Sequence, residues 1–222
     1  NNYAMAKLHA DLVQAGTCFL AMEQTAGKGQ RGRQWQSAAG QNITLSIILP
    51  PFHHISFPFL ESAIIALTCY DFIKDLGIGN VFVKWPNDVY IGDRKAAGIL
   101  VENVYRGSEW RSSVAGIGMN INQTIFPPAV GRAVSLKQVT GKHNDVVGLG
   151  RELHRKVIAA VGDLEGSSPE HIIERYNSRL YKKDEEVKLK MGPQVFTTLI
   201  RGVSMAGELL TTDTLERSFA VG

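Results

Sequence analysis

The sequence predicts an α+β fold, in which helices flank a mixed, mostly antiparallel sheet and a small β domain follows at the carboxyl end. Three observations support this prediction. Strand-like segments between residues 81 and 122 follow one another through short turns, which is typical of hairpins rather than of alternating βαβ units. Longer apolar stretches lie before and after this region. After residue 183 the chain changes to short strand-like pieces, so we predict two domains, residues 1–183 and 184–222.

The first third of the chain predicts a helix, two strands and a second helix. Apolar side chains recur at helical spacing in residues 1–14, and Gly16 stands where that helix would end. Residues 17–23 and 43–49 are apolar runs on either side of a glycine-rich stretch, which predicts a strand, a long loop and a strand. The near-continuous apolar character of residues 57–76 predicts a largely buried helix.

The rest of the chain predicts strands, two helices and further strands. Three strands are expected between turn-forming dipeptides, at residues 81–85, 89–104 and 110–122. Residues 145–164 and 169–180 predict helices, and Ser168 and Pro169 suit the N-cap and the first turn of the second one. Four short strands are expected in a small, barrel-like module, at residues 186–190, 194–204, 208–212 and 218–221.

The composition fits a globular chain with one substantial core. The chain has 222 residues, of which 44% are hydrophobic and 20% are charged. Its formal net charge of +3 is too small to imply a nucleic-acid or membrane surface over the whole chain. The apolar runs fall short of the ~20 residues that cross a bilayer. Because Cys18 and Cys69 are isolated in the sequence, we expect no disulfide framework and a location in the reducing cytoplasm.

The densest chemical signal is the sequence EQTAGKGQRGRQW at residues 23–35, in which three glycines alternate with Lys28, Arg31 and Arg33. Glycine lets a ligand approach the backbone, and the cations attract phosphates. The glycine spacing also fits the dinucleotide fingerprint, but no helical pattern follows it, and the kinase triplets HRD and DFG do not occur in the sequence. A flexible surface loop is the alternative, and three cations among three glycines favour a phosphate-binding loop.

The second signal is KWPNDVYIGDRKAAGILVE at residues 84–102. It places Asn87 and Asp88 at a turn, where they can bind a nucleotide or its magnesium. Small residues follow Lys95, so its ammonium group is suited to act as a fixed charge against a ligand carboxylate. The alternative is a lysine at the end of a hairpin, in solvent.

A third piece, GIGMNIN at residues 116–122, places Gly116 and Gly118 on one face of a strand, where a large group can rest. Asn120 and Asn122 can read a base or ribose, or can simply begin a turn. Together the three motifs suit attack of a carboxylate on an α-phosphate, which is adenylation. The six histidines lack metal-ligand spacing, so we expect no metal site held by the protein alone, and a serine hydrolase elbow does not occur.

In this order and spacing, the three blocks resemble the motifs GRGRxGR, KWPND followed by KxAGIL, and GxGxNxN of the catalytic core of biotin protein ligases. The resemblance covers residues 1–183. It implies a fold related to class II aminoacyl-tRNA synthetases, with an SH3-like domain at residues 184–222. It also implies that biotin reacts with MgATP to give biotinyl-5′-AMP and pyrophosphate. A lysine of a biotin carboxyl carrier protein or domain then takes the biotin and releases AMP.

The resemblance further implies roles for individual residues. Lys95 and Arg31 match basic residues that contact biotin and the adenylate, and Asp88 matches a carboxylate near the metal and the incoming lysine; these three are the expected catalytic residues. The expected biotin-binding positions are Asn1, Thr25, Gly29, Gln30, Arg31, Lys95, Gly98 and Gly116. The expected ATP and adenylate contacts are Arg31, Arg33, Trp35, Asn87, Lys95 and Asn120.

The sequence departs from the family pattern at several positions. Lys28 and Gln30 stand where arginines are common, and Asn1 alone represents the biotin-binding STN segment. In the expected adenylate-covering segment, residues 126–136, Ala133 replaces an aromatic residue of some members. Because the sequence begins at the catalytic core, we expect a form without the DNA-binding domain and without operator binding, and an exposed edge strand suggests a homodimer.

Three alternatives to a biotin ligase stay open. A lipoate ligase has the same fold and chemistry, although its RRxSGGG-type loop does not occur here. A nucleic-acid-binding module would use the loop cations on phosphates, but more basic residues and exposed aromatics would be expected. A catalytically silent homologue would explain the departures, whereas the presence of Arg31, Asp88 and Lys95 argues for activity.

Overall fold

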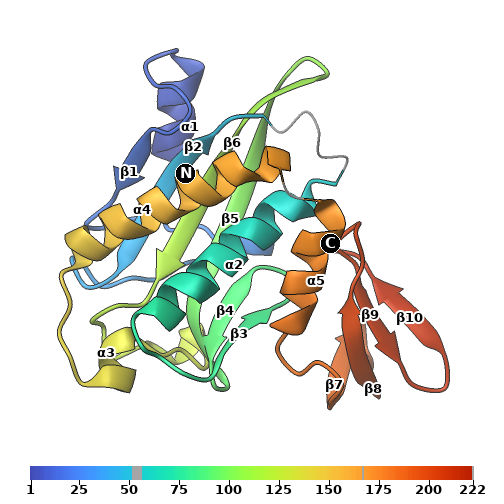
Figure 1. Ribbon diagram of the computed structural model, residues 1–222. Coiled ribbons are helices and arrows are strands. Elements are labelled where there is room, and N and C mark those ends of the chain that lie inside the picture. Colours follow the sequence, from blue (N-terminus) through green and yellow to red (C-terminus); the bar gives the residue numbers. More distant parts are fainter. Residues whose placement is uncertain (52–56, 167, 222) are drawn as a thin grey trace.

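The computed structural model describes residues 1–51, 57–166 and 168–221 (Figure 1). A six-stranded sheet runs in the order β1-β2-β6-β5-β4-β3, and its neighbouring strands pair antiparallel. Its strands are β1 (Cys18–Leu20), β2 (Ile43–Leu49), β3 (Val81–Lys84), β4 (Asp88–Ile91), β5 (Arg94–Arg106) and β6 (Glu109–Met119). A four-stranded antiparallel sheet follows in the order β10-β9-β8-β7. Its strands are β7 (Glu186–Met191), β8 (Gln194–Val203), β9 (Leu209–Thr212) and β10 (Glu216–Phe219).

Three helices cover one face of the six-stranded sheet, where they lie side by side in Figure 1. They are α2 (Phe59–Asp75), α4 (Val146–Gly162) and α5 (Pro169–Ser178). Helix α1 (Asn2–His9) packs on the opposite face, because Ala4 forms a small buried cluster there with Ile48 and Val114. The remaining helical segments are η1 (Gln30–Gly32), η2 (Pro128–Val130), α3 (Leu136–Thr140) and η3 (Asp163–Gly166). None of the helices in these ranges has the length and hydropathy that a bilayer crossing requires.

Side-chain alternation separates the core from the face that is left open. In β2, four aliphatic side chains point toward the helices and are almost fully buried: Ile43, Leu45, Ile47 and Leu49. Thr44 and Ser46 point the other way, because successive strand residues face opposite sides. They pair directly with Gly118 and Gly116 of β6, so this second face is lined by small residues.

Much of the predicted element order is confirmed. The strand expected at residues 43–49 is β2, and the helix expected at 57–76 is α2. Ser168 caps α5 through a hydrogen bond of 3.2 Å that its hydroxyl accepts from the amide of His171, and Pro169 begins that helix. These signals are local, since they depend on side-chain chemistry within one turn or strand.

Other expectations were wrong in extent. The helix expected at residues 1–14 ends at His9, because Asp11 takes a left-handed φ of 54° that a helix does not allow. The strand expected at 89–104 is two strands, since the chain reverses at Gly92, which has a φ of 55°. Helix α3 was not expected, and the last strand, expected at 218–221, is Glu216–Phe219.

Candidate active site

A cavity of about 1230 Å³ opens on the face of the six-stranded sheet opposite α2 and α4. Its volume exceeds the ~300–1,000 Å³ of common small-molecule pockets, which suits a site for two ligands. All the residues that the resemblance assigned to catalysis, biotin or the nucleotide line it: Asn1, Thr25, Gly29, Gln30, Arg31, Arg33, Trp35, Asn87, Asp88, Lys95, Gly98, Gly116 and Asn120. Residues from four separate stretches of chain therefore meet at one place.

The floor of the cavity is built from glycines in adjacent strands. Gly98 of β5 pairs with Gly118 of β6, and the indole of Trp35 lies over both. A β-carbon on Gly118 would overlap that ring, and one on Gly116 would come within 2.6 Å of the Asn1 amide oxygen. The large group expected on the glycine face is therefore in part a side chain of the protein itself.

An ion pair stands at the edge of this floor. The Lys95 ammonium lies 2.6 Å from a carboxylate oxygen of Asp88, with 29% and 19% of the two side chains exposed. The ammonium also lies 5.6 Å from the centre of a Trp35 ring. The β4–β5 hairpin brings the two together, because Asp88 pairs with Gly98 and Tyr90 pairs with Lys95. Lys95 is thus held over the cavity, which rules out the alternative of a lysine pointing into solvent.

The expected adenylate-covering segment meets the backbone of Lys95. The Lys95 amide donates to the carbonyl of Arg132 at 2.7 Å, and the amide of Val134 donates to the carbonyl of Lys95 at 2.9 Å. Ala133 therefore forms an isolated parallel bridge with Lys95. Residues 132–134 fix one wall of the site, while their own side chains add no aromatic ring to it.

The cationic loop is closed on itself by backbone bonds. The Gly29 amide donates to the carbonyl of Arg33 at 2.7 Å, and the Trp35 amide donates to the carbonyl of Gly27 at 3.0 Å. A β-carbon on Gly27 would overlap the Trp35 carbonyl, so glycine is required there. Arg31 has a φ of 55° at the tip of the loop, a conformation that few non-glycine residues adopt. Such strain at a loop tip that lines a cavity is typical of functional sites.

The side chains of Asn87, Asn120 and Asn122 donate hydrogen bonds to backbone carbonyls of other segments. Asn87 donates to the carbonyl of Ile99 at 2.5 Å, and Asn120 donates to the carbonyls of Lys95 and Val134 at 3.3 and 3.2 Å. Asn122 does not line the cavity and donates instead to the carbonyl of Asn144 at 2.9 Å. Asn122 therefore joins the stretch after β6 to the stretch before α4, and its partner lies 22 residues away instead of within a turn. For Asn120, whose two side-chain N–H groups both donate to these carbonyls, a nucleotide contact would have to use the amide oxygen, whereas Asn87 bonds Ile99 through only one of its two N–H groups.

Gln24 and Cys18 are among the cavity residues that the sequence reasoning did not nominate. Gln24 has a buried side-chain oxygen with no hydrogen-bond partner among the described residues, which makes it a candidate to meet a ligand donor. Its position directly before the glycine loop is a signal that could have identified it. Cys18 also lines the cavity, but burial raises the pKa of its thiol to about 11, so it is protonated and a poor nucleophile at neutral pH.

The fold and the site together define a protein that can hold a carboxylate and a phosphate chain in one cavity on an antiparallel sheet. Within the described ranges, no three His, Cys, Asp or Glu side chains gather as a metal-binding group. The ammonium of Lys95 and the cationic side chains of the loop, Lys28, Arg31 and Arg33, line the same cavity.

Comparisons with known proteins identify the family. The sequence pattern of the Biotin/lipoate A/B protein ligase family matches residues 1–120, which is more than half of the chain. The chain belongs to this family. It is 32% identical over 205 residues to the "Bifunctional ligase/repressor BirA" of Escherichia coli K12, covering 89% of this chain and 62% of the relative. It is 38% identical over 105 residues to the "Biotin--[acetyl-CoA-carboxylase] ligase" of Paracoccus denitrificans, covering 46% and 43% of the two chains.

A solved structure supports the same assignment at the level of the fold. The biotin protein ligase from Aquifex aeolicus in complex with biotin and ATP superimposes with a TM-score of 0.80 and 26% identity. The match covers 93% of this chain and 87% of that one, so it includes the small β sheet as well as the large one. The α+β core with an antiparallel sheet, followed by a small β domain, is confirmed.

Proposed function

We propose that this chain is an ATP-dependent biotin protein ligase. It forms biotinyl-5′-AMP from biotin and MgATP and transfers the biotin to a lysine of a biotin carboxyl carrier protein or domain of a carboxylase. The observation that carries this proposal is the meeting of the Lys95–Asp88 pair, the cationic loop and the glycine floor in one cavity. The names of the relatives support biotin as the acid, and a lipoate ligase activity is the alternative within the family.

In the first step, a carboxylate oxygen of biotin attacks the α-phosphorus of ATP. The bond from that phosphorus to the bridging oxygen breaks, and pyrophosphate leaves with the bonding electrons. An ammonium group has three N–H donors, so Lys95 can hold the incoming carboxylate while it stays paired with Asp88. Its charge and those of Arg31 and Arg33 offset the repulsion between the anions and stabilise the transition state.

In the second step, the neutral amine of the carrier lysine attacks the carbonyl carbon of the mixed anhydride, and AMP leaves. The amine nitrogen loses a proton as the amide forms. Asp88 is the cavity carboxylate next to Lys95, and we assign it to hold the incoming amine and accept this proton. Nucleotide-bound Mg²⁺ takes most of its ligands from phosphate and water, so this one carboxylate also fits an ion that arrives with ATP.

The remaining assignments follow from this proposal. Residues 1–183 would form the catalytic domain, with residues 184–222 as an SH3-like domain, and the protein would act in the cytoplasm on biotin, ATP and a carrier, without binding DNA or a membrane. A homodimer would use the sheet edge at β1, because the backbone of Val83 in β3, at the other edge, already bonds to Arg179 and Tyr181.

The test is biotin-dependent exchange of labelled pyrophosphate into ATP, with lipoate as the comparison acid and Lys95→Ala as the inactive control. Exchange with biotin alone would support the proposal, and transfer of label to a purified carrier domain would then complete it. Exchange with lipoate alone would move the assignment to lipoate. No exchange with either acid would identify a silent homologue.

A further inference from the structure

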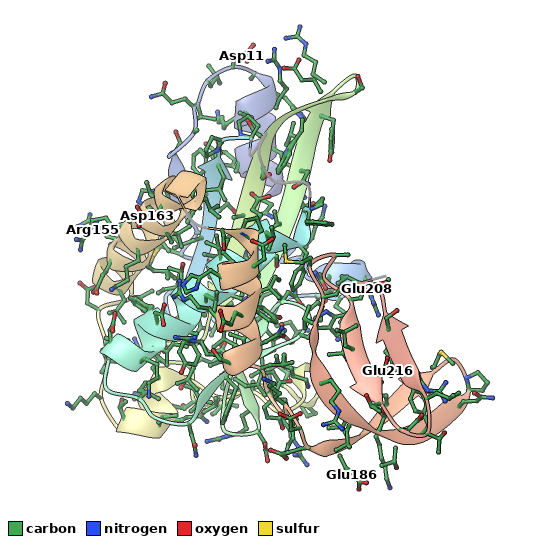
Figure 2. All side chains as sticks on the ribbon, turned by 45° about the vertical axis from the view of Figure 1, so that its right-hand side comes forward. Asp11, Arg155, Asp163, Glu186, Glu208 and Glu216 are labelled. Atoms are coloured by element: carbon green, nitrogen blue, oxygen red, sulfur yellow. The ribbon has the colours of Figure 1, made fainter. Side chains whose placement is uncertain are left out.

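The small β sheet touches the turn that carries Asp88. The indole N–H of Trp85 donates to the carbonyl of Gly207 at 2.8 Å, across 122 residues of sequence. Trp85 opens the turn between β3 and β4, and Gly207 lies in the turn between β8 and β9. Figure 2 shows Glu208, the residue after Gly207, at the end of the small sheet nearest the rest of the molecule.

Gly207 cannot be exchanged freely at this contact. It has a φ of 85°, and a β-carbon on it would overlap the ring of Phe59 in α2. Phe59 in turn meets the ring of Tyr176 edge-on at 5.4 Å. Tyr176 is fully buried, and its hydroxyl donates to the carbonyl of Pro86 at 3.2 Å. The turn at residues 85–88 is therefore held from two sides, by the β8–β9 turn and by α5.

A second pair of hydrogen bonds joins the small sheet to α5, the helix that carries Tyr176. The side chain of Asn177 in α5 donates to the carbonyl of Val203 at 3.0 Å and accepts from its amide at 2.7 Å. A β-carbon on Gly202 would come within 3.3 Å of this amide group, so the strand runs close against the helix. The end of β8 that leads into Gly207 thus has a defined position relative to Tyr176.

The held turn continues directly into the catalytic pair. Asn87 is joined to Ile99 of β5 by its side chain at 2.5 Å and by its backbone carbonyl at 2.9 Å. The next residue, Asp88, holds the ammonium of Lys95 at 2.6 Å. A displacement of Trp85 therefore has few residues over which to relax before it reaches Asp88.

We propose that Trp85 is a positioning residue, which couples the β8–β9 turn through the Gly207 carbonyl to the Asp88–Lys95 pair. This inference rests on the proposed function for its kinetic consequence, while the coupling itself is a property of the unliganded protein. It makes the small β sheet a working part of the site, although none of its residues needs to touch a substrate.

The perturbation is applied from both sides of the contact. Trp85→Phe keeps an aromatic ring and removes the N–H donor, and Gly207→Ala shifts the carbonyl by forcing a β-carbon against Phe59. Gly192→Ala is the matched control, because Gly192 has a φ of 57° in the β7–β8 turn and a β-carbon added to it would meet no atom within 4 Å. It introduces the same backbone strain into the small sheet without touching the contact.

Kinetics separate positioning from general destabilisation. We expect Trp85→Phe and Gly207→Ala each to lower kcat of pyrophosphate exchange about tenfold, the scale of one lost hydrogen bond, with KM for biotin changed less than about threefold. The double variant should lose no more than the worse single variant, because both act through one contact. Gly192→Ala should keep wild-type kcat even where its Tm falls. Wild-type kcat in Trp85→Phe, or additive losses in the double variant, would overturn the proposal.

A second measurement does not depend on activity. Hydrogen–deuterium exchange of the unliganded chain should become faster at residues 87–91 in Trp85→Phe and Gly207→Ala and stay unchanged there in Gly192→Ala. Unchanged protection in both contact variants would overturn the coupling. If the wild-type chain shows no biotin-dependent exchange but the deuterium result holds, the proposed function fails and the coupling stands.

Discussion

Replacing Glu61 by glutamine is expected to remove a pH dependence from the stability of this protein. Glu61 lies in the first turn of α2 with 1% of its surface exposed. One carboxyl oxygen accepts a hydrogen bond of 3.0 Å from the hydroxyl of Ser113, and the other has no hydrogen-bond partner in the described part of the chain. Burial raises the pKa of this carboxyl to about 7, since the charged form loses its water.

The raised pKa of Glu61 sets the direction and the size of the change in unfolding free energy with pH. In the unfolded chain Glu61 ionises at its ordinary pKa of 4.5, so between pH 4.5 and about 7 the unfolded state gives up a proton that the folded state keeps. Ionisation then favours unfolding, and the free energy of unfolding falls with rising pH across this window. Because each tenfold change in proton affinity is worth about 1.4 kcal/mol, the full loss is about 3 kcal/mol, complete above pH 7.

Urea unfolding of the wild type and Glu61→Gln at half-unit steps from pH 4.5 to 8.5 measures this difference. Glutamine does not ionise, so the gap between the two proteins should move by about 3 kcal/mol in favour of Glu61→Gln as pH rises. Burying the glutamine amide without hydrogen-bond partners lowers the free energy of unfolding of Glu61→Gln by a fixed amount. Because this amount is the same at every pH, it does not alter how the difference between the two proteins changes with pH. Parallel stability curves over the whole range would refute the reasoning.

Three further predictions concern the cavity. Lys95→Ala should slow biotin-dependent pyrophosphate exchange by about 10²–10³-fold, as expected for loss of one charge at the transition state, and exchange near the wild-type rate would remove the mechanism. Arg31→Gly should fold normally, because glycine adopts a φ of 55° without strain, and should form biotinyl-5′-AMP but release it, which quench and chromatography of the free adenylate would detect. Gly118→Ala should displace Trp35 and cost about 1–3 kcal/mol in urea unfolding together with weaker ATP binding by calorimetry. Gly79→Ala, where no atom lies within 4 Å of the added carbon, is its control.

Local signals predicted many of the elements and several of the residues that line the cavity. The strand Ile43–Leu49 is a run of β-branched and aliphatic residues between polar and proline boundaries, and that pattern alone marks it. Residues such as Arg31, Asp88 and Lys95 could be nominated because their spacing within each motif is a property of the sequence. The structure then brings these motifs to one cavity.

Long-range contacts set the limit of prediction. The sequence shows asparagine at positions 120 and 122, but whether an amide faces a ligand depends on where distant segments arrive. Asn120 bonds to Val134, and Asn122 bonds to Asn144, and neither partner is marked by any local pattern. The sequence also contains no signal for the end of α1 at His9. The residue with the left-handed φ after the helix is Asp11, whereas glycine is the residue that usually marks such an end.

One strand encodes both the core and the site, because its two faces carry side chains of opposite size. In β6 the side chains of Ala115, Ile117 and Met119 are buried toward the helices, while Gly116 and Gly118 alternate with them on the cavity side. An aliphatic side chain at Gly116 would overlap the Asn1 amide and one at Gly118 would overlap the Trp35 indole. A glycine at an aliphatic position would leave a hole in the core. A shift of one residue in the pairing of this strand would therefore exchange the two faces and destroy the core and the cavity together. The burial that stabilises the sheet thus also fixes the register that keeps the glycine floor beneath Lys95.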